Sequence, residues 1–428
     1  MTKKLKFPDG FLWGAATSAH QVEGNVHNDW SEWEKENAER LAEEAGGKWK
    51  KWQQEKFPEM FEKENYISGA ACDHYNLYES DFDTAKELGH NAHRFSIEWS
   101  RIEPEEGKFD EKEIEHYKDV MKSLKNKELE PFVTLWHYTN PLWIRNIGGW
   151  TNKKTVEYFI RYAEKIISIF PEVKFWVILN EPTVYVSLSY LKGTQPPGRK
   201  NIFLARRAMN NLTQAHKSTY EMIHKNLESA KVGTAYSVNY WQGYKKYPWN
   251  WILAKIMNSL EGYFFRKIEN KSDYIGLQYY RSVTLGWKWG GNFWGIFDST
   301  FHESKDFTDL GWNIYSRGIY YFLKKVAKYN LPIYITENGI ADADDSKREK
   351  FIKGHLFWVH KAISEGADVR GYFYWSLMDN IEFVEDRGFW PRFGLIEVDY
   401  KTQVRTIRKS ALEYAKICKS NELEIDGK

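Results

Sequence analysis

Two glutamates stand at the ends of short apolar runs, where a charged side chain is unexpected unless it reaches solvent or has partners. Glu337 follows Leu331–Thr336, a run rich in β-branched and aromatic residues. Glu181 comes at the end of a second run, Phe175–Leu179, and Pro182 closes that stretch. Burying a carboxylate is costly unless it has partners, so each glutamate either points into solvent or belongs to a site.

The two runs together favour a site. If both are strands of one parallel barrel, both carboxylates face the same rim, and that rim is where barrel enzymes carry their chemistry. Two opposed carboxylates are also the minimal equipment for cleaving a glycosidic bond. For either glutamate taken alone, a solvent-facing strand end remains the alternative.

The elements that must position these groups alternate along the chain. Helical periodicity, as in Glu111–Lys127, separates eight strand-like runs. These runs are Phe11–Thr17, Asn91–Ile97, Pro131–Trp136, Phe175–Leu179, Val232–Val238, Tyr274–Tyr280, Ile333–Thr336 and Gly371–Trp375. The alternation predicts an α/β fold, a single (β/α)8 TIM barrel over residues 1–428 with loop insertions at its C-terminal rim. An open doubly wound sheet is the alternative, but the first strand lacks a Gly-rich phosphate loop.

Two connections stand out from this alternation. Tyr240–Asn270 is rich in aromatic residues and is expected to contain at least one helix. Arg281–Leu310 is rich in Gly and Trp, and we expect it to be a long loop that faces substrate.

Composition narrows the partners and the compartment. Lys plus Arg total 61 and Asp plus Glu total 59, so no single-sign field indicates a nucleic acid or membrane partner. The 2 cysteines lack metal-ligand spacing, no His-x-His occurs, and no secretory h-region is recognisable. We therefore expect a cytoplasmic protein with no metal and no organic cofactor. The 20 Trp residues suit core packing and also a cleft that stacks on sugar faces.

Other polar and aromatic side chains follow the predicted strands at the same rim. Each one alone has an ordinary structural explanation, such as a core histidine or a salt-bridged arginine. Their gathering at one end of different strands indicates a site. The group comprises Gln21, Arg94, His137, Asn180, Gln278, Tyr280, Trp375, Glu382 and Phe383.

Six segments carry a resemblance to a known family. They read FPDGFLWGAATSAHQVEG, ACDHYNLYESD, RFSIEWSRIEP, ILNEP, ITENG and YWSLMDN, the last followed by Glu382 and RFGLIEVDY. In this order and at these strands, they resemble glycoside hydrolase family 1, the β-glucosidase-type retaining glycosidases, from Phe7 to about Tyr414.

The resemblance implies roles for the two carboxylates. Glu337 matches the nucleophile and Glu181 the general acid/base, which retention requires about 5–5.5 Å apart. Glu337 should be ionised, with Arg94 and Tyr280 in support, and Glu181 should be protonated. No cofactor is implied, because two carboxylates and water suffice.

The resemblance also implies a sugar subsite. Gln21, His137, Asn180, Trp375 and Glu382 match positions that line it, with Trp375 as its stacking floor. In the 6-phospho-glycosidase branch the position of Glu382 is typically Ser, so a carboxylate here favours an unphosphorylated sugar.

Three side chains depart from the family pattern. Phe383 replaces the usual Trp, Gln278 replaces Asn, and Tyr138 replaces Trp or Phe. We expect Gln278 and Phe383 to bind substrate beside the other subsite residues. We expect all three changes to affect substrate preference more than bond breaking.

The predicted function is therefore a retaining exo-β-glycosidase that hydrolyses terminal non-reducing β-D-glucosyl residues, with galactosyl and fucosyl residues as further candidates. Its partners would be small β-glycosides or oligosaccharides. Alternatives are a sugar-binding protein on a catalytically weak barrel, a transglycosylase and a β-mannosidase. Loss of either carboxylate would indicate the binding protein, and the chain keeps both. The sequence does not indicate an oligomeric state.

Overall fold

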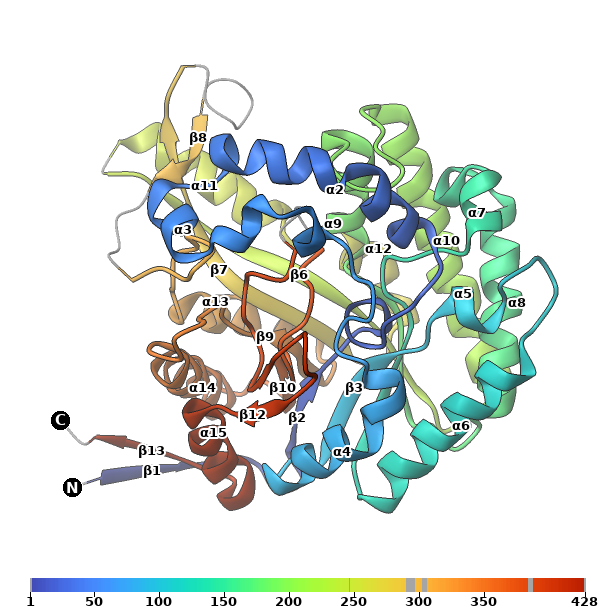
Figure 1. The fold of residues 1–428 in the computed structure, drawn as a ribbon. Coiled ribbons are helices and arrows are strands. Elements are labelled where there is room, and N and C mark those ends of the chain that lie inside the picture. The colour runs from blue at the N-terminus through green and yellow to red at the C-terminus, as the bar shows by residue number, and fades with distance from the viewer. Residues whose placement is uncertain (1, 246, 290–296, 302–305, 384–387, 427–428) are drawn as a thin grey trace.

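A closed barrel of eight parallel strands forms the centre of the protein, in a computed structural model that describes residues 2–245, 247–289, 297–301, 306–383 and 388–426 (Figure 1). The strands are β2 (Leu12–Ala16), β3 (Ala92–Ser96), β4 (Glu130–Trp136), β5 (Phe175–Asn180), β6 (Lys231–Gly243), β7 (Ile275–Trp287), β9 (Ile333–Asn338) and β10 (Val369–Trp375). Each strand pairs in parallel with its neighbour, and β10 pairs with β2. The predicted (β/α)8 barrel is confirmed, and all eight predicted runs are barrel strands.

Helices surround the barrel and connect its strands (Figure 1). The longer ones are α4 (His74–Glu87), α6 (Glu111–Asn126), α8 (Lys154–Ile169), α10 (Ile202–Asn226), α11 (Pro248–Leu260), α12 (Tyr263–Ile268), α13 (Arg317–Val326), α14 (Arg348–Ser364) and α15 (Lys409–Ser420). Shorter ones are α1 (Ala19–Val22), α5 (Trp99–Ile102), α7 (Leu142–Asn146), α9 (Pro182–Val186), η3 (Gly149–Thr151), η4 (Ser187–Lys192), η5 (Glu269–Lys271) and η6 (Ala327–Tyr329).

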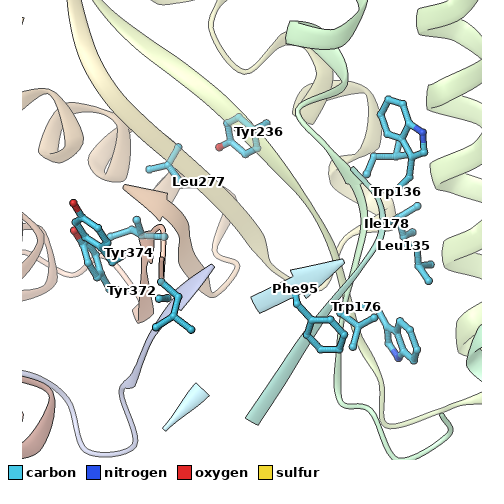
Figure 2. Packing of buried hydrophobic residues seen from close by; sticks show 14 of the residues in the cluster. Phe95, Leu135, Trp136, Trp176, Ile178, Tyr236, Leu277, Tyr372 and Tyr374 are labelled. Atoms are coloured by element: carbon cyan, nitrogen blue, oxygen red, sulfur yellow. The ribbon is translucent and has the colours of Figure 1, made fainter. Parts of the chain in front are cut away.

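Side chains alternate between the two faces of the barrel wall, as the period of a strand requires. Outward-facing residues such as Trp176, Ile178 and Tyr372 pack against the surrounding helices in one large apolar cluster. Figure 2 shows Leu135 and Ile178 on the side of the wall that faces a helix.

Aromatic rings fill the inside of the barrel beneath its C-terminal rim. Phe132 and Phe175 stack at 4.2 Å between ring centroids, and Phe373 lies 4.7 Å from Phe132. Tyr274 and Tyr334 complete this layer. The packed layer makes the barrel a solid core rather than a pore, so a site can form only above it.

Strands β6 and β7 extend beyond the barrel, which corrects one prediction. Arg281–Leu310 was expected to be a loop, but β7 continues to Trp287 and pairs with the antiparallel strand β8 (Phe297–Phe301). The extension is stable because β6 pairs with β7 as far as Gly243, and because Leu285 packs on Leu253 of α11. The rest of the expected loop at 290–296 and 302–305 lies outside the described residues.

The remaining elements are an insertion between β2 and β3 and short strand pairs that include the two chain ends. The helices of the insertion are α2 (Asp29–Lys48), α3 (Lys51–Lys56), η1 (Pro58–Phe61) and η2 (Lys63–Tyr66). Strand β1 (Thr2–Lys6) pairs with β13 (Glu422–Asp426), and β11 (Ile396–Val398) pairs with β12 (Arg405–Ile407). In the described part of the chain, no helix has the length and apolar character to cross a bilayer.

Candidate active site

A cavity of about 820 Å³ opens at the carboxyl ends of the barrel strands. It brings together eight of the predicted site residues from seven different segments of the chain. They are Gln21, His137, Asn180, Glu181, Tyr280, Glu337, Trp375 and Glu382.

Glu337 is the carboxylate with a cation beside it. It lies in β9, and its Oε1 accepts a hydrogen bond from Nη1 of Arg94, in an ion pair that is fully buried on the arginine side. Its Oε2 accepts from the hydroxyl of Tyr280 in β7. Burial raises the pKa of Glu337, while Arg94 and Tyr280 oppose that rise by stabilising the carboxylate. Arg94 and Tyr280 are thus the two groups that favour the ionised form of Glu337 against the effect of burial.

Arg94 is held so that its charge stays on this carboxylate. Its Nη2 donates to Oδ1 of Asn180 at 2.6 Å, and its Nε donates to Oγ1 of Thr134 at 3.2 Å. Nη1 also donates to the carbonyl oxygen of Thr336 at 3.2 Å. Every nitrogen of the guanidinium is thus used, and the group links β3, β4, β5 and β9 at the rim.

Glu181 lies in a different setting. Its backbone has a φ of 43°, in the left-handed region that non-glycine residues rarely adopt, and Pro182 starts α9 directly after it. The amide of Glu181 donates to the carbonyl of Ala235 at 2.8 Å and fixes this turn. Such strained backbone is common where a side chain must be aimed into a site.

No ion pair joins Glu181 to a lysine or arginine within the residues that the structure describes. Burial and the nearby charge of Glu337 raise the pKa of Glu181 to about 8. The two carboxyls therefore differ in their contacts: Glu337 has a buried cation beside it, whereas Glu181 has none and feels the charge of Glu337.

The hydroxyl of Tyr138 donates a hydrogen bond to Oε2 of Glu181. The backbone of Tyr138 also has a left-handed φ, of 73°. The expectation that the Tyr138 departure acts on substrate preference more than on bond breaking stays a prediction, and this contact of the hydroxyl with a cavity carboxyl is a reason to test it.

Hydrogen bonds and ring stacking hold the predicted sugar-subsite residues in place along one wall of the cavity. Nε1 of Trp375 donates to Oε1 of Glu382 at 3.0 Å, and the Trp375 ring stacks at 6.0 Å on that of His137. Nε2 of Gln21 donates to the carbonyl of Ile381 at 2.6 Å. These contacts fix the faces that the side chains present to the cavity.

Gln278 and Phe383 are not among the described residues that line the cavity. Nε2 of Gln278 donates to Oδ1 of Asn180 at 2.9 Å, so Gln278 positions a lining residue from behind. Phe383 packs edge-on against Trp30 at 4.4 Å and against Tyr138 at 5.7 Å. The cavity lining therefore does not support the expected direct contact of Gln278 and Phe383 with substrate. Gln278 is hydrogen-bonded to Asn180, and Phe383 packs on aromatic rings.

The outer half of the cavity was not predicted residue by residue. Trp241, Met257, Leu260 and Tyr263 line it, and all come from the aromatic connection Tyr240–Asn270. The excess of aromatic residues in that connection was the available signal. Apolar lining of this kind suits the leaving group of a glycoside rather than its sugar.

Comparison with known proteins gives a consistent result. The family model described as "Glycosyl hydrolase family 1" matches residues 3–274 and 243–423. The β-glucosidase A of Thermotoga maritima is 32% identical, with 98% of this chain and 99% of that protein covered.

Two further relatives show the range of the family. The solved structure of a β-glycosidase from Pyrococcus horikoshii is 38% identical, covers 98% of this chain and 96% of its own, and superposes with a TM-score of 0.86. A 6-phospho-β-galactosidase of Staphylococcus epidermidis is 30% identical over 99% of this chain and 100% of its own. With a family match along nearly its whole length and a matching fold, the chain belongs to glycosyl hydrolase family 1.

Proposed function

We propose that the protein is a cytoplasmic retaining exo-β-glycosidase, with one catalytic domain over residues 1–428, that releases terminal β-D-glucosyl residues from small β-glycosides or oligosaccharides. The chain is a glycoside hydrolase by family. The observation that carries the assignment of roles is the contrast between two carboxyls on one cavity. Glu337 has Arg94 in contact, whereas Glu181 has no such cation and a raised pKa.

In the first step Glu337 attacks the anomeric carbon as a carboxylate. The bond from that carbon to the leaving oxygen breaks, and Glu181 gives its proton to the oxygen. Arg94 and Tyr280 hold Glu337 in its ionised form and fix its orientation, because each donates to one of its two oxygens.

In the second step the ester on Glu337 is hydrolysed. Esterification removes the negative charge of Glu337, so the repulsion that helped to raise the pKa of Glu181 is gone. Glu181, now ionised, takes a proton from water as the water oxygen attacks the anomeric carbon. The released sugar keeps the β configuration, and Glu337 is a carboxylate again.

The glycone is proposed from the subsite, because relatives of similar identity differ in the sugar that their names give. Glu382 is held by Trp375 on the cavity wall, and a carboxylate there repels a phosphate. Burial lowers the pKa of His137, so a neutral imidazole faces the sugar hydroxyls beside Asn180. This set supports a neutral hexose, with glucose first and galactose or fucose next.

A panel of p-nitrophenyl β-glycosides tests the proposal, with the released anomer followed by NMR. We expect turnover of the β-glucoside with the β-anomer released first, and no turnover of 6-phospho-β-glucoside. Release of the α-anomer first would contradict retention, and faster turnover of the β-mannoside would replace the proposed glycone.

A matched pair of variants tests the roles. Glu337→Gln should abolish turnover, whereas Glu261→Gln should keep it, because Glu261 lines the outer half of the same cavity and takes part in neither step. Full activity in Glu337→Gln would refute the nucleophile.

A further inference from the structure

Helix α11 presents a continuous apolar stripe to solvent. Trp249, Ile252, Ile256 and Leu260 recur at intervals of three or four residues, so they lie on one face of the helix. Each is between 47% and 61% exposed. Single exposed apolar residues are ordinary, but a contiguous stripe of four marks a surface that binds something.

The opposite face of α11 explains why this stripe points outward. Leu253 and Ala254 are buried against the extensions of β6 and β7, where Leu253 packs on Leu285. Asn258 is bonded to both backbone groups of Trp241 at 2.8 and 3.0 Å. The helix is therefore fixed on the strands, and rotation cannot bury the stripe.

The segment that contains the stripe is mainly basic. Residues 244–267 contain five basic residues, Lys245, Lys246, Lys255, Arg266 and Lys267, and one acidic residue, Glu261. Glu261 lines the cavity and accepts from Nε1 of Trp241 at 2.6 Å, so it does not offset the lysines on the outer side. The whole chain carries only +2, whereas residues 244–267 alone carry five basic side chains and one acidic one, so this segment around α11 is locally basic.

We propose that the outer face of α11 docks on an anionic lipid surface. A helix with Trp and aliphatic residues on one face, and with basic residues in it and in the flanking segments, buries that face at the headgroup boundary, where the cations meet anionic lipids. Tyr247 and Tyr263, each 48% exposed, stand at the two ends of the helix and suit the same boundary. The sequence-based expectation of no membrane partner rested on the charge of the whole chain and on the lack of a spanning apolar run, and peripheral docking of this kind requires neither.

A second copy of the chain fits the same face less well. A symmetric dimer through α11 would set two basic regions of the same sign against each other, and like charges across an interface oppose association. An anionic lipid surface instead complements that charge.

The docking face continues into the active-site cavity. Leu260 belongs to the stripe and also lines the cavity, together with Met257 of α11 and Tyr263 of α12. Resting on the proposed glycosidase function, this placement gives the substrate class as amphiphilic β-glycosides, with the sugar in the cavity and the apolar aglycone in the lipid. The helix would then bring the mouth of the cavity to sugars displayed at the surface.

Co-sedimentation with vesicles tests the docking without using activity. The full-length protein is mixed with vesicles of phosphatidylcholine with 30 mol% phosphatidylglycerol, or of phosphatidylcholine alone, each at two salt concentrations. We expect binding to the anionic vesicles that weakens with salt. Ile252→Gln/Ile256→Gln should weaken it at least about tenfold, and Lys255→Glu should weaken it by roughly tenfold.

The matched control removes two equally exposed apolar side chains elsewhere. Val404 and Leu412 are 58% and 50% exposed, near β12 and on α15, which lie far from α11 in Figure 1. Val404→Gln/Leu412→Gln should bind vesicles as the wild type does. An equal loss in both double variants would overturn the assignment to α11.

Two further measurements separate lipid docking from loss of the proposed glycosidase activity and from dimerisation through α11. Hydrolysis of a soluble p-nitrophenyl β-glucoside should be unchanged in Ile252→Gln/Ile256→Gln, so loss of vesicle binding would not reflect loss of the proposed function. Sedimentation velocity should give the same mass for that variant and the wild type. A wild type that ignores anionic vesicles, or one that is a dimer and becomes a monomer in the variant, would overturn the proposal.

Discussion

The two carboxyls of the cavity are distinguished by their immediate partners rather than by their residue type. Both are glutamates at strand ends and both are buried. Only Glu337 has a guanidinium in contact, and only Glu181 accepts from Tyr138. Because the proposed acid and the proposed nucleophile differ in these contacts, the pH dependence of the rate in single-residue variants can tell the two glutamates apart.

We expect kcat/KM to fall on the alkaline side with an apparent pKa of about 8. The proposed mechanism needs Glu181 protonated, and the pKa of Glu181 is raised to about 8 by burial and by the charge of Glu337. The measurement is a pH–rate profile on a neutral β-glucoside with enzyme stability checked at each pH. An alkaline limb below about pH 6 would contradict the assignment of Glu181 as the acid.

Tyr138→Phe should move that alkaline limb upward. The hydroxyl of Tyr138 stabilises the carboxylate form of Glu181, so its removal makes the proton harder to lose. Loss of one hydrogen bond to a charged group corresponds to about 1 pH unit. Tyr185→Phe, on a buried tyrosine of the same cluster, serves as the control and should leave the limb in place. A change in KM with no shift of the limb in Tyr138→Phe would mean that this position acts on substrate preference.

At this scale the sequence predicted eight of the cavity-lining residues, but neither their contacts nor the lining from Tyr240–Asn270. The strand-end positions of Glu181 and Glu337 place them at one rim for any parallel barrel, so the pair was predictable. The contact of Tyr138 with Glu181 depends on a left-handed φ at residue 138, which no local pattern around a non-glycine residue indicates. Phe383 faces Trp30 in an insertion distant in sequence, so its packing was equally hidden.

At the scale of elements, the site depends on how closely the ends of β9 and β10 approach. A side chain at Gly339 would place its Cβ 1.8 Å from the carbonyl oxygen of Trp375. Glycine is therefore required there so that Trp375, whose carbonyl makes this contact, and Glu337, two residues before Gly339, can line one cavity.

Gly339→Ala should separate these two strand ends and reduce activity by two orders of magnitude or more, since a displacement of about 1 Å at the chemistry costs that much. It should also lower the free energy of unfolding by about 1–3 kcal/mol, because a methyl group would be forced into packed backbone. Gly47→Ala is the control, because a Cβ at Gly47, in the last turn of α2, meets nothing within 4 Å. Steady-state kinetics and urea unfolding of both variants test this, and a fully active Gly339→Ala would show that the approach is not required.

The order of elements was predictable, whereas the extent of two of them was not. Apolar runs that alternate with helical periodicity define the barrel at this length, and the eight runs are its eight strands. The extensions of β6 and β7 carry mixed residues that read as a loop, because their stability comes from pairing with each other and from Leu253 of α11. Such non-local partners cannot be read from a window of sequence.

At the scale of the whole molecule, the raised pKa of the buried Glu181 carboxyl makes the stability of the fold depend on pH. The ordinary pKa of a glutamate, near 4.5, applies to Glu181 in the unfolded chain, and the value in the folded protein is about 8. Between these values the folded state holds one proton more than the unfolded state, so stability falls as pH rises through this window. Below about pH 4.5 the side chain is protonated in both states and the cost vanishes.

Glu181→Gln should therefore stabilise the protein at alkaline pH and not at acid pH. Glutamine keeps the shape of the protonated acid but never ionises, so the gain should grow from near zero at about pH 4.5 to its full size above about pH 8. A shift of this size corresponds to an upper bound of several kcal/mol, and a gain on the order of 3 kcal/mol would raise Tm by about 3 °C in a chain of this length. Differential scanning calorimetry of both proteins across this range measures it. A gain in stability that is equal at every pH would mean that the titration of Glu181 is not its source. A gain that grows between about pH 4.5 and pH 8 would show that the raised pKa of Glu181 lowers the stability of the fold.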